Sequence, residues 1–324
     1  MGLAPDLQRI RGYATSYQES KAVLTAVQLG VFTDLANRSR GAAELASERG
    51  FAPESLELLL NALAAMDLLV ASDGLYSPTE AACRFLADGG EDSLAPLFRH
   101  QDHMWDLWSG LGTAIGDRGD GPTEEEELED FIGTMAVNGR LGAPGVIGAI
   151  DLAGVERFLD LGGGPGSYSM EVLRRLPEVD AALFDYPDIL PIARRHLAKA
   201  GFEKKVRLLG GDLFADDLGG GYDLILASNV LHIYGEEKIA GILGRCLAAL
   251  KDGGRAAFND FWLEPSRTRP RRAAVFALHM LVVGRGGRTY SWEEMEGMLA
   301  AAGFTGIERL PVTDQSGVIV GRRP

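Results

Sequence analysis

Acidic residues lie before and after a glycine-rich turn, at spacings that suit the binding of a nucleoside. Asp160 precedes the turn Gly162-Gly163-Gly164-Pro165-Gly166, and Asp185 and Asp212 close the next two apolar segments. Glycines let a ligand approach the backbone closely, and an acid beside the turn disfavours a phosphate but tolerates a cation. Asp185 can accept hydrogen bonds from both ribose hydroxyls, as acids about 20 residues after such turns do.

The residues around these acids narrow the class of ligand. Leu213 and Phe214 follow Asp212 and would lie beside an adenine base whose amino group donates to Asp212. The dinucleotide fingerprint G-x-G-x-x-G is not met, because Ser167 or Ser169 takes the place of the third glycine. Each acid alone is also compatible with a turn or a helix N-cap, but three at successive strand ends favour one site. A cationic nucleoside without phosphate fits this pattern, and S-adenosylmethionine is such a cofactor.

A histidine that follows another strand-like segment is a candidate general base. His232 lies just beyond residues 222–227, and a neutral imidazole with a pKa near ~6.5 can take a proton from a phenol with a pKa near ~10. Such a base usually needs an acceptor that orients it, and Asp260, after the next strand-like segment, is the candidate. The alternatives are a buried core histidine and a turn aspartate.

These residues need a scaffold that brings strand ends together, and the pattern from about residue 153 onward predicts one. Strand-like and helical segments alternate there, which predicts an α/β fold with a mostly parallel sheet and helices on both faces. Ligands bind such sheets at the carboxyl ends of the strands, near the switch point of the strand order. The expected strands are 157–161, 181–185, 206–209, 222–227 and 255–261, and the expected helices between them include 192–200 and 236–250.

The N-terminal part of the chain has a different pattern. Residues 1 to about 90 predict helices, among them 42–49 and 53–69, with a break at Gly30 and a small hairpin around Asp73-Gly74. This is a mainly helical, winged-helix-like unit. A dimerisation and packing role is favoured over the reading of DNA.

Composition excludes several classes of function. The net charge of −14 argues against a nucleic-acid partner. Two cysteines, Cys83 and Cys246, cannot form a disulfide framework. The apolar run 273–283 contains His279 and is too short to span a bilayer, and residues 1–10 lack the core of a signal peptide. We therefore expect a cytoplasmic protein without a membrane partner.

Four motifs carry a resemblance to a known family: DLGGGPG at 160–166, FDYP at 184–187, GDLF at 211–214 and NVLHIY at 229–234. The chain resembles the class I S-adenosylmethionine-dependent methyltransferases, and more closely their caffeic acid and hydroxyindole O-methyltransferase type. The resemblance implies a dimerisation domain over 1–95, a helical linker and acceptor-pocket segment over 96–152, and a Rossmann-like catalytic domain with a seven-stranded sheet over 153–324. It also implies a homodimer that acts on a small-molecule acceptor.

The resemblance assigns residues to the cofactor site. Tyr234 would pack near the adenine, and Ser228 stands where the plant members carry a lysine, so that contact is lost or changed. The implied S-adenosylmethionine contacts are Asp160, Gly162, Gly164, Asp185, Tyr186, Asp212, Leu213, Phe214, Ser228, Asn229 and Tyr234.

The resemblance also bears on the chemistry. His232 matches the family's catalytic histidine, and Asp260 takes the position of a catalytic glutamate. The family's second glutamate falls near Thr289, where no acid stands. This departure weakens the O-methylation assignment and leaves other methyl acceptors open.

Acceptor contacts are expected on two further helical segments. Trp105 and Trp108 share a helix face at which a flat acceptor can stack, with core packing as the alternative. His103, Met135 and His279 are further candidate acceptor contacts. His279 is either a polar wall of the pocket or, with His232, a metal ligand as in relatives that C-methylate 2-oxo acids.

The first hypothesis is an O-methyltransferase for a small aromatic or polyketide-like hydroxyl, with His232 as base and Asp260 as its partner. The second is a C- or N-methyltransferase that uses a metal at His232 and His279. The third, a DNA-binding regulator, is disfavoured by the net charge of −14.

Overall fold

The computed structural model describes residues 3–116, 123–284, 286–313 and 316–324. The chain divides into two compact units: the first comprises Met1–Asp120 and Ser266–Val283, and the second comprises Gly121–Pro265 and Gly284–Pro324. The segment 266–283, which the sequence analysis grouped with the catalytic domain, thus packs within the first unit. The boundaries at 95 and 152 stay predictions.

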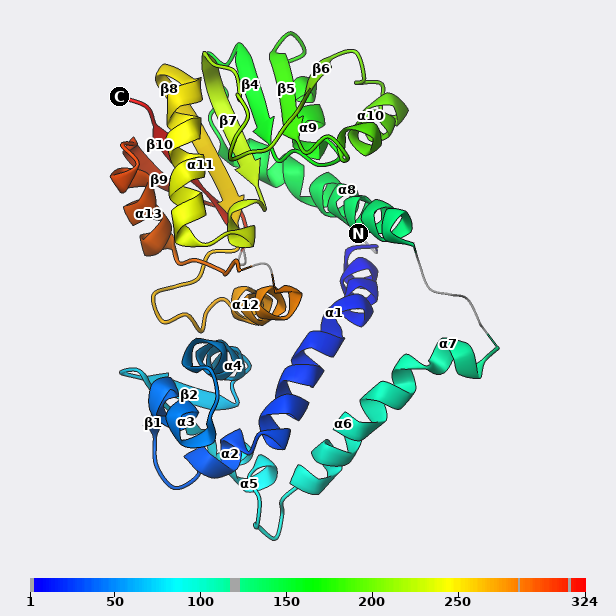
Figure 1. Ribbon diagram of the computed structural model, residues 1–324, viewed down its shortest axis with the longest axis vertical. Coiled ribbons are helices and arrows are strands. Elements are labelled where there is room, and N and C mark those ends of the chain that lie inside the picture. Colours follow the sequence, from blue (N-terminus) through cyan, green and yellow to red (C-terminus); the bar gives the residue numbers. More distant parts are fainter. Residues whose placement is uncertain (1–2, 117–122, 285, 314–315) are drawn as a thin grey trace. The chain divides into compact units, whose positions relative to one another are not determined.

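The first unit is mainly helical. Its helices are α1 (Leu3–Gln28), α2 (Val31–Leu35), α3 (Ala42–Arg49), α4 (Pro53–Ala65), α5 (Glu80–Leu86), α6 (Ala95–Ser109), α7 (Leu111–Ala114) and α12 (Arg271–Val283). Its strands β1 (Arg40–Gly41), β2 (Leu69–Ser72) and β3 (Leu75–Pro78) form a sheet in the order β1-β3-β2. The predicted winged-helix-like arrangement of helices and a hairpin is present (Figure 1).

Backbone conformation explains where these elements end. Gly30 has a φ of 76° and separates α1 from α2, as predicted. Asp73 and Gly74 both have positive φ (52° and 75°), the conformation that a two-residue hairpin turn requires. The expected helix 53–69 was too long, because α4 ends at Ala65 and Asp67 takes a φ of 59° before β2 begins.

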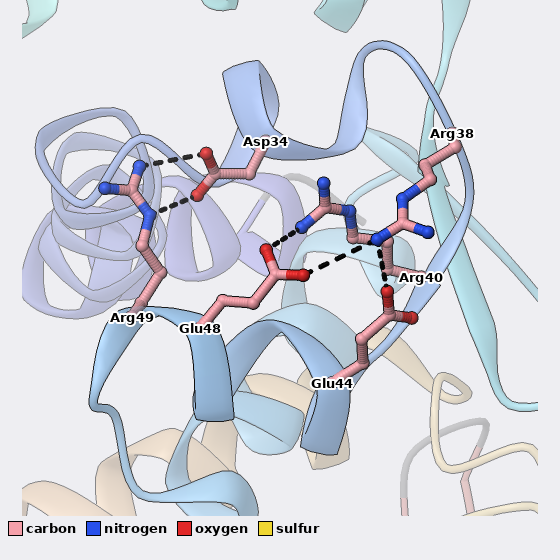
Figure 2. A network of polar contacts seen from close by, with 6 residues as sticks. All are labelled: Asp34, Arg38, Arg40, Glu44, Glu48 and Arg49. Atoms are coloured by element: carbon pink, nitrogen blue, oxygen red, sulfur yellow. Dashed lines mark hydrogen bonds and ion pairs between the residues drawn. The ribbon is translucent and has the colours of Figure 1, made fainter.

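Ion pairs join α3 to the segments before it. Arg49 makes a bidentate contact with Asp34 at 2.6 and 2.9 Å, and Glu48 pairs with both Arg38 and Arg40 (Figure 2). Arg38 also reaches Glu44 at 2.5 Å. Arg38, Glu44, Glu48 and Arg49 are exposed, whereas Asp34 and Arg40 are partly buried. The exposed pairs fix local geometry more than they contribute to stability.

The second unit alternates strands and helices. Its helices are α8 (Glu124–Ala149), α9 (Ser167–Arg175), α10 (Leu190–Lys199), the 3₁₀ helix η1 (Leu231–Ile233), α11 (Glu236–Ala249) and α13 (Trp292–Ala301). Its strands are β4 (Arg157–Leu161), β5 (Asp180–Asp185), β6 (Val206–Gly210), β7 (Tyr222–Ser228), β8 (Leu250–Asp260), β9 (Thr305–Pro311) and β10 (Gly317–Arg322).

These strands form one seven-stranded sheet in the order β6-β5-β4-β7-β8-β10-β9. The pairs β5–β6, β4–β5, β4–β7 and β7–β8 are parallel, whereas β10 is antiparallel to β8 and β9. The order reverses between β4 and β7, which is the switch point at which such sheets bind ligands. The predicted Rossmann-like fold class is confirmed (Figure 1).

Helices cover both faces of the sheet. Side chains of α11 and α13, such as Ile242 and Leu299, pack on one face, and those of α8, α9 and α10, such as Ile147 and Leu197, pack on the other. Alternate strand residues therefore face opposite layers. Among the described residues, none of the helices combines the length and hydropathy that crossing a bilayer requires.

Candidate functional site

The turn between β4 and α9 is shaped by glycine. Gly162, Gly164 and Gly166 have φ values of 65°, 51° and 80°. A Cβ on Gly162 would lie 2.7 Å from a methyl carbon of Val230, which follows β7. A side chain at this position is therefore excluded both by the backbone conformation and by the neighbouring loop. The backbone of the turn stays open to a ligand.

Asp160, before this turn, is hydrogen bonded to the helix α9 that follows it. Its Oδ2 accepts hydrogen bonds from the backbone nitrogen of Ser169 at 2.9 Å and from the Ser169 hydroxyl at 2.7 Å. Burial raises the pKa of the Asp160 carboxyl to about 6, although the bonds from Ser169 act in the opposite direction. A cationic ligand nearby would favour the ionised form. A direct contact with the cofactor stays a prediction.

Asp185 ends β5 and faces the same turn. Its Oδ2 accepts from the nitrogen of Gly164 at 2.8 Å, and its Oδ1 accepts from the nitrogen of Tyr186 at 2.8 Å. Burial raises the pKa of Asp185, and these two bonds lower it. Each carboxylate oxygen has a second lone pair. Asp185 can thus hold the turn and still accept from two ribose hydroxyls.

Asp212 and its neighbours form the adenine end of the predicted site. Its Oδ1 accepts from the nitrogen of Phe214 at 2.9 Å, and Leu213 between them is buried. The rings of Phe214 and Tyr234 meet edge to face at 5.0 Å. Burial, and then hydrogen bonding with Tyr186, raises the pKa of Tyr234, so its phenol stays neutral. The structure brings these predicted residues together.

Ser228 and Asn229 leave the carboxyl end of β7. The Ser228 hydroxyl accepts from Nδ2 of Asn259 at 2.8 Å and from Nδ2 of Asn229 at 3.2 Å. Asn229 has a φ of 58°, a conformation that asparagine adopts more readily than most residues. Its nitrogen donates to the carbonyl of Asn259 at 2.9 Å, which ties the loop to β8.

His232 and Asp260 form a buried pair. Nδ1 of His232 lies 2.7 Å from Oδ1 of Asp260, and the exposed fractions of the two residues are 9% and 3%. Oδ2 of Asp260 also accepts from the backbone nitrogen of His232 at 3.3 Å. The carboxylate therefore fixes both the ring and its backbone, which places the proton of the neutral ring on Nδ1 and the basic lone pair on Nε2.

A second segment supports the histidine. A Cβ on Gly287 would stand 2.0 Å from the carbonyl oxygen of His232, so the two backbones are in direct contact there. The Tyr290 hydroxyl donates to the carbonyl of Tyr234 at 2.8 Å. Thr289, between Gly287 and Tyr290 in the sequence, is buried. Sequence reasoning missed Gly287, for which the pair Gly286-Gly287 is the one visible signal.

Sequence reasoning also missed Tyr168 and Asn259. Tyr168 is in the first turn of α9, and burial raises the pKa of its hydroxyl. Asn259 is 5% exposed and precedes Asp260 in β8. The run Ser167-Tyr168-Ser169 directly after the glycine turn was the available signal.

The predicted acceptor residues divide between the two units. Trp105 and Trp108 line a hollow of about 870 Å³ in the first unit, with Phe98 and Met104 beside them. His103, also on α6, is exposed. His279, on α12, lies 3.5 Å from Gln18 through Nδ1 and stacks on Phe276.

Met135 is half-buried on α8 of the second unit. Across the described ranges, no group of three or more His, Cys, Asp or Glu side chains is arranged to hold a metal ion. A role for any of the five predicted acceptor residues stays a prediction.

The residues present fit S-adenosylmethionine. An open glycine turn, an acid at the end of β5 and an acid beside an aromatic pair converge at the carboxyl edge of one sheet. The strand order and this site define a class I S-adenosylmethionine-dependent methyltransferase. The chain matches the O-methyltransferase domain over residues 97–305 and the O-methyltransferase dimerisation domain over 12–88. It belongs to the O-methyltransferase family.

Relatives span nearly the whole chain. It is 29% identical to the 3-hydroxy-5-methyl-1-naphthoate 3-O-methyltransferase of Streptomyces sahachiroi, over 95% of this chain and 93% of that protein. It is 29% identical to TcmO, the tetracenomycin polyketide synthesis 8-O-methyl transferase of Streptomyces glaucescens, over 95% and 94%.

Solved structures agree on the fold. An O-methyltransferase family 2 protein from Planctomyces limnophilus in complex with apigenin has a TM-score of 0.82 at 24% identity, and the match covers 100% of this chain and 97% of that one. PigF with S-adenosylhomocysteine has a TM-score of 0.59 at 28% identity, over 97% and 99%.

The ribose role of Asp185 can be tested by calorimetry with S-adenosylmethionine. Because Asp185→Ala removes two charge-assisted hydrogen bonds, we expect affinity to fall about a hundredfold or more. Asp188→Ala, which removes an exposed carboxylate on the same loop, should bind as the wild type does. Near-native affinity of Asp185→Ala would contradict the assignment.

The raised pKa of Asp160 predicts a pH dependence of stability. The folded state binds the Asp160 proton more tightly than the unfolded chain, whose value is 3.8. Stability is therefore greatest below the unfolded value and is lost as pH rises to about 6. Relative to Asp160→Asn, the wild type should lose about 1.4 kcal/mol of unfolding free energy from about pH 5 to about pH 7.5. Urea unfolding at both pH values measures this, and parallel curves would refute the burial argument.

Proposed function

We propose that this enzyme O-methylates a small aromatic or polyketide-like hydroxyl, with His232 as general base and Asp260 as its orienting partner. The observation that carries the proposal is the buried 2.7 Å contact between Nδ1 of His232 and Asp260. The names of the relatives, a naphthoate 3-O-methyltransferase and a tetracenomycin 8-O-methyl transferase, support the acceptor class.

In this proposal the residues of the site have separate roles. When bound, S-adenosylmethionine supplies an electrophilic methyl group. Nε2 of His232 takes the proton of the acceptor hydroxyl as that oxygen forms its new bond. Asp260 then stabilises the imidazolium and keeps the ring in place. Gly287 and Asp260 both contact the backbone of His232, so the base is held before the acceptor arrives.

His232→Ala separates proton transfer from cofactor binding. We expect kcat to fall about a hundredfold or more, because the base is lost, while affinity for S-adenosylmethionine stays within about twofold. His196→Ala, on α10 of the same unit, is the matched control and should keep full activity. Retained turnover in His232→Ala would mean that proximity alone drives methyl transfer.

We further propose that the chain forms a homodimer through its dimerisation domain. In the first unit, large apolar side chains are exposed along α1 and along α6 and α7. Tyr13, Leu107 and Ile115 have exposed fractions of 78%, 69% and 79%. A second copy of the chain that covers these side chains would remove them from water, which favours association.

Analytical ultracentrifugation, which measures the oligomeric state, tests whether this surface forms the dimer interface. The wild type should sediment as a dimer of the 34.7 kDa chain. Ile10→Asp combined with Ile115→Asp should shift it to monomer, because each buried carboxylate opposes association. Val70→Glu, at an exposed apolar position of the hairpin, should remain a dimer. A double variant that stays dimeric would contradict the proposed interface.

A further inference from the structure

Residues 287–291, which we call the clamp segment, contact the loop that carries His232. A Cβ on Gly287 would overlap the carbonyl oxygen of His232, so the two backbones are in direct contact. The hydroxyl of Tyr290 donates to the carbonyl of Tyr234 at 2.8 Å. The clamp segment therefore holds two backbone carbonyls of this loop.

The clamp segment is also joined to the chain just beyond Asp260. Leu263 follows the end of β8 by three residues and forms a parallel bridge with Ser291. In this bridge the nitrogen of Leu263 donates to the carbonyl of Tyr290 at 2.9 Å. One segment thus contacts both parts of the chain that supply the histidine and its carboxylate.

Arg288 supplies a further contact to the loop. Its Nη2 donates to Oε1 of Glu236 at 2.6 Å and to Oε1 of Glu294 at 2.9 Å. Its guanidinium carbon lies 4.2 Å from the ring centroid of Tyr290. Glu236 is the first residue of α11, directly after the loop, and Glu294 is in the first turn of α13. A single side chain therefore ties the end of the loop to α13.

Burial indicates which partner of this contact is fixed. The Glu236 side chain is 65% exposed, and an isolated ion pair with so exposed a carboxylate contributes little. The side chains of Arg288 and Glu294 are only 27% and 23% exposed, and the ring of Tyr290 is buried. Glu294 and the ring of Tyr290 hold the planar guanidinium in place. The exposed Glu236 therefore meets a guanidinium that is already oriented.

We propose that Arg288 is a positioning residue for the general base. It fixes the end of the loop that carries His232, and the backbone contacts of the clamp segment fix the middle of that loop. Because a hydrogen bond weakens steeply with misalignment, the 2.7 Å contact between Nδ1 of His232 and Asp260 requires the loop to stay in place. The catalytic consequence rests on the proposed function of His232, whereas the contacts involve neither the acceptor nor the cofactor.

The variant Arg288→Gln tests the proposal on the full-length enzyme, because it removes the charge but keeps a polar side chain. In hydrogen–deuterium exchange followed by mass spectrometry, residues 231–236 should exchange about tenfold faster or more, since the loop opens more easily. The strands β4, β5 and β7 should exchange as in the wild type.

The ring of His232 gives a second readout, by NMR of protein labelled with ¹⁵N-histidine. The signals of His232 are those that disappear in His232→Ala. In the wild type the nitrogen shifts should be those of a ring with its proton on Nδ1, which Asp260 accepts. In Arg288→Gln they should move toward the average of the two tautomers, because the ring is no longer held against the carboxylate.

Arg309→Gln is the matched control. Arg309 also pairs with two glutamates, Glu296 at 2.6 Å and Glu293 at 2.9 Å, and lies 5.8 Å from the ring centroid of Trp292. It joins β9 to α13, so its replacement should change neither the exchange of the loop nor the signals of His232.

Three outcomes would overturn the proposal. The loop of Arg288→Gln exchanges as in the wild type, or the strands become faster by the same factor, which indicates only a structural role, or the signals of His232 stay unchanged while the loop opens. Should Arg288→Gln not fold, Tyr290→Phe, which removes only the hydroxyl bonded to Tyr234, decides by the same criteria. Neither readout depends on turnover, so failure of this proposal is distinguishable from retained turnover in His232→Ala, which would contradict the base itself.

Discussion

The close approach of Gly162 to Val230 is the constraint on which the site depends. Where the strand order reverses, β4 and β7 lie side by side and their carboxyl ends emerge together. One of these ends becomes the cofactor turn, and the other continues through Asn229 and Val230 to His232. Because only a hydrogen atom fits between Gly162 and Val230, the glycine turn and the loop that carries His232 are fixed against each other.

Three carboxylates at the carboxyl edge of the sheet are largely removed from water. Asp185 and Asp260 end strands of the same sheet, Asp160 is the penultimate residue of another, and backbone N–H groups hold all three carboxylates. Their desolvation is tolerable because hydrogen bonds replace water and because the ligand carries positive charge. Each carboxylate therefore has a local structural partner as well as a functional assignment.

Much of this arrangement could be predicted from the sequence because it follows from local pattern. The predicted ends of β4 and β5, Leu161 and Asp185, are the observed ones, because apolar runs with an acid at or near their end mark them. The Asp73-Gly74 turn likewise predicted the hairpin. The end of α4 was missed because Leu68 and Leu69 continue the apolar pattern past a residue with positive φ. The early start of β8 at Leu250 depends on its pairing with Tyr222, a contact between distant segments.

The same distinction applies to the site. Asp185 and Asp212 were found because strand ends converge in any parallel sheet, whereas Ser228 of β7 and Asn259 of β8 are joined by side-chain geometry alone. An asparagine before an aspartate has no distinctive spacing. Only the fold shows that it meets Ser228.

The backbone around His232 also limits how this enzyme can diversify. Asn229 has a φ of 58°, which admits glycine, aspartate and few other residues, and Gly287 leaves no room for a side chain against the histidine's carbonyl. Random libraries at these two positions would consist mostly of inactive members. Directed evolution of this enzyme should therefore hold positions 229 and 287 constant and vary other positions.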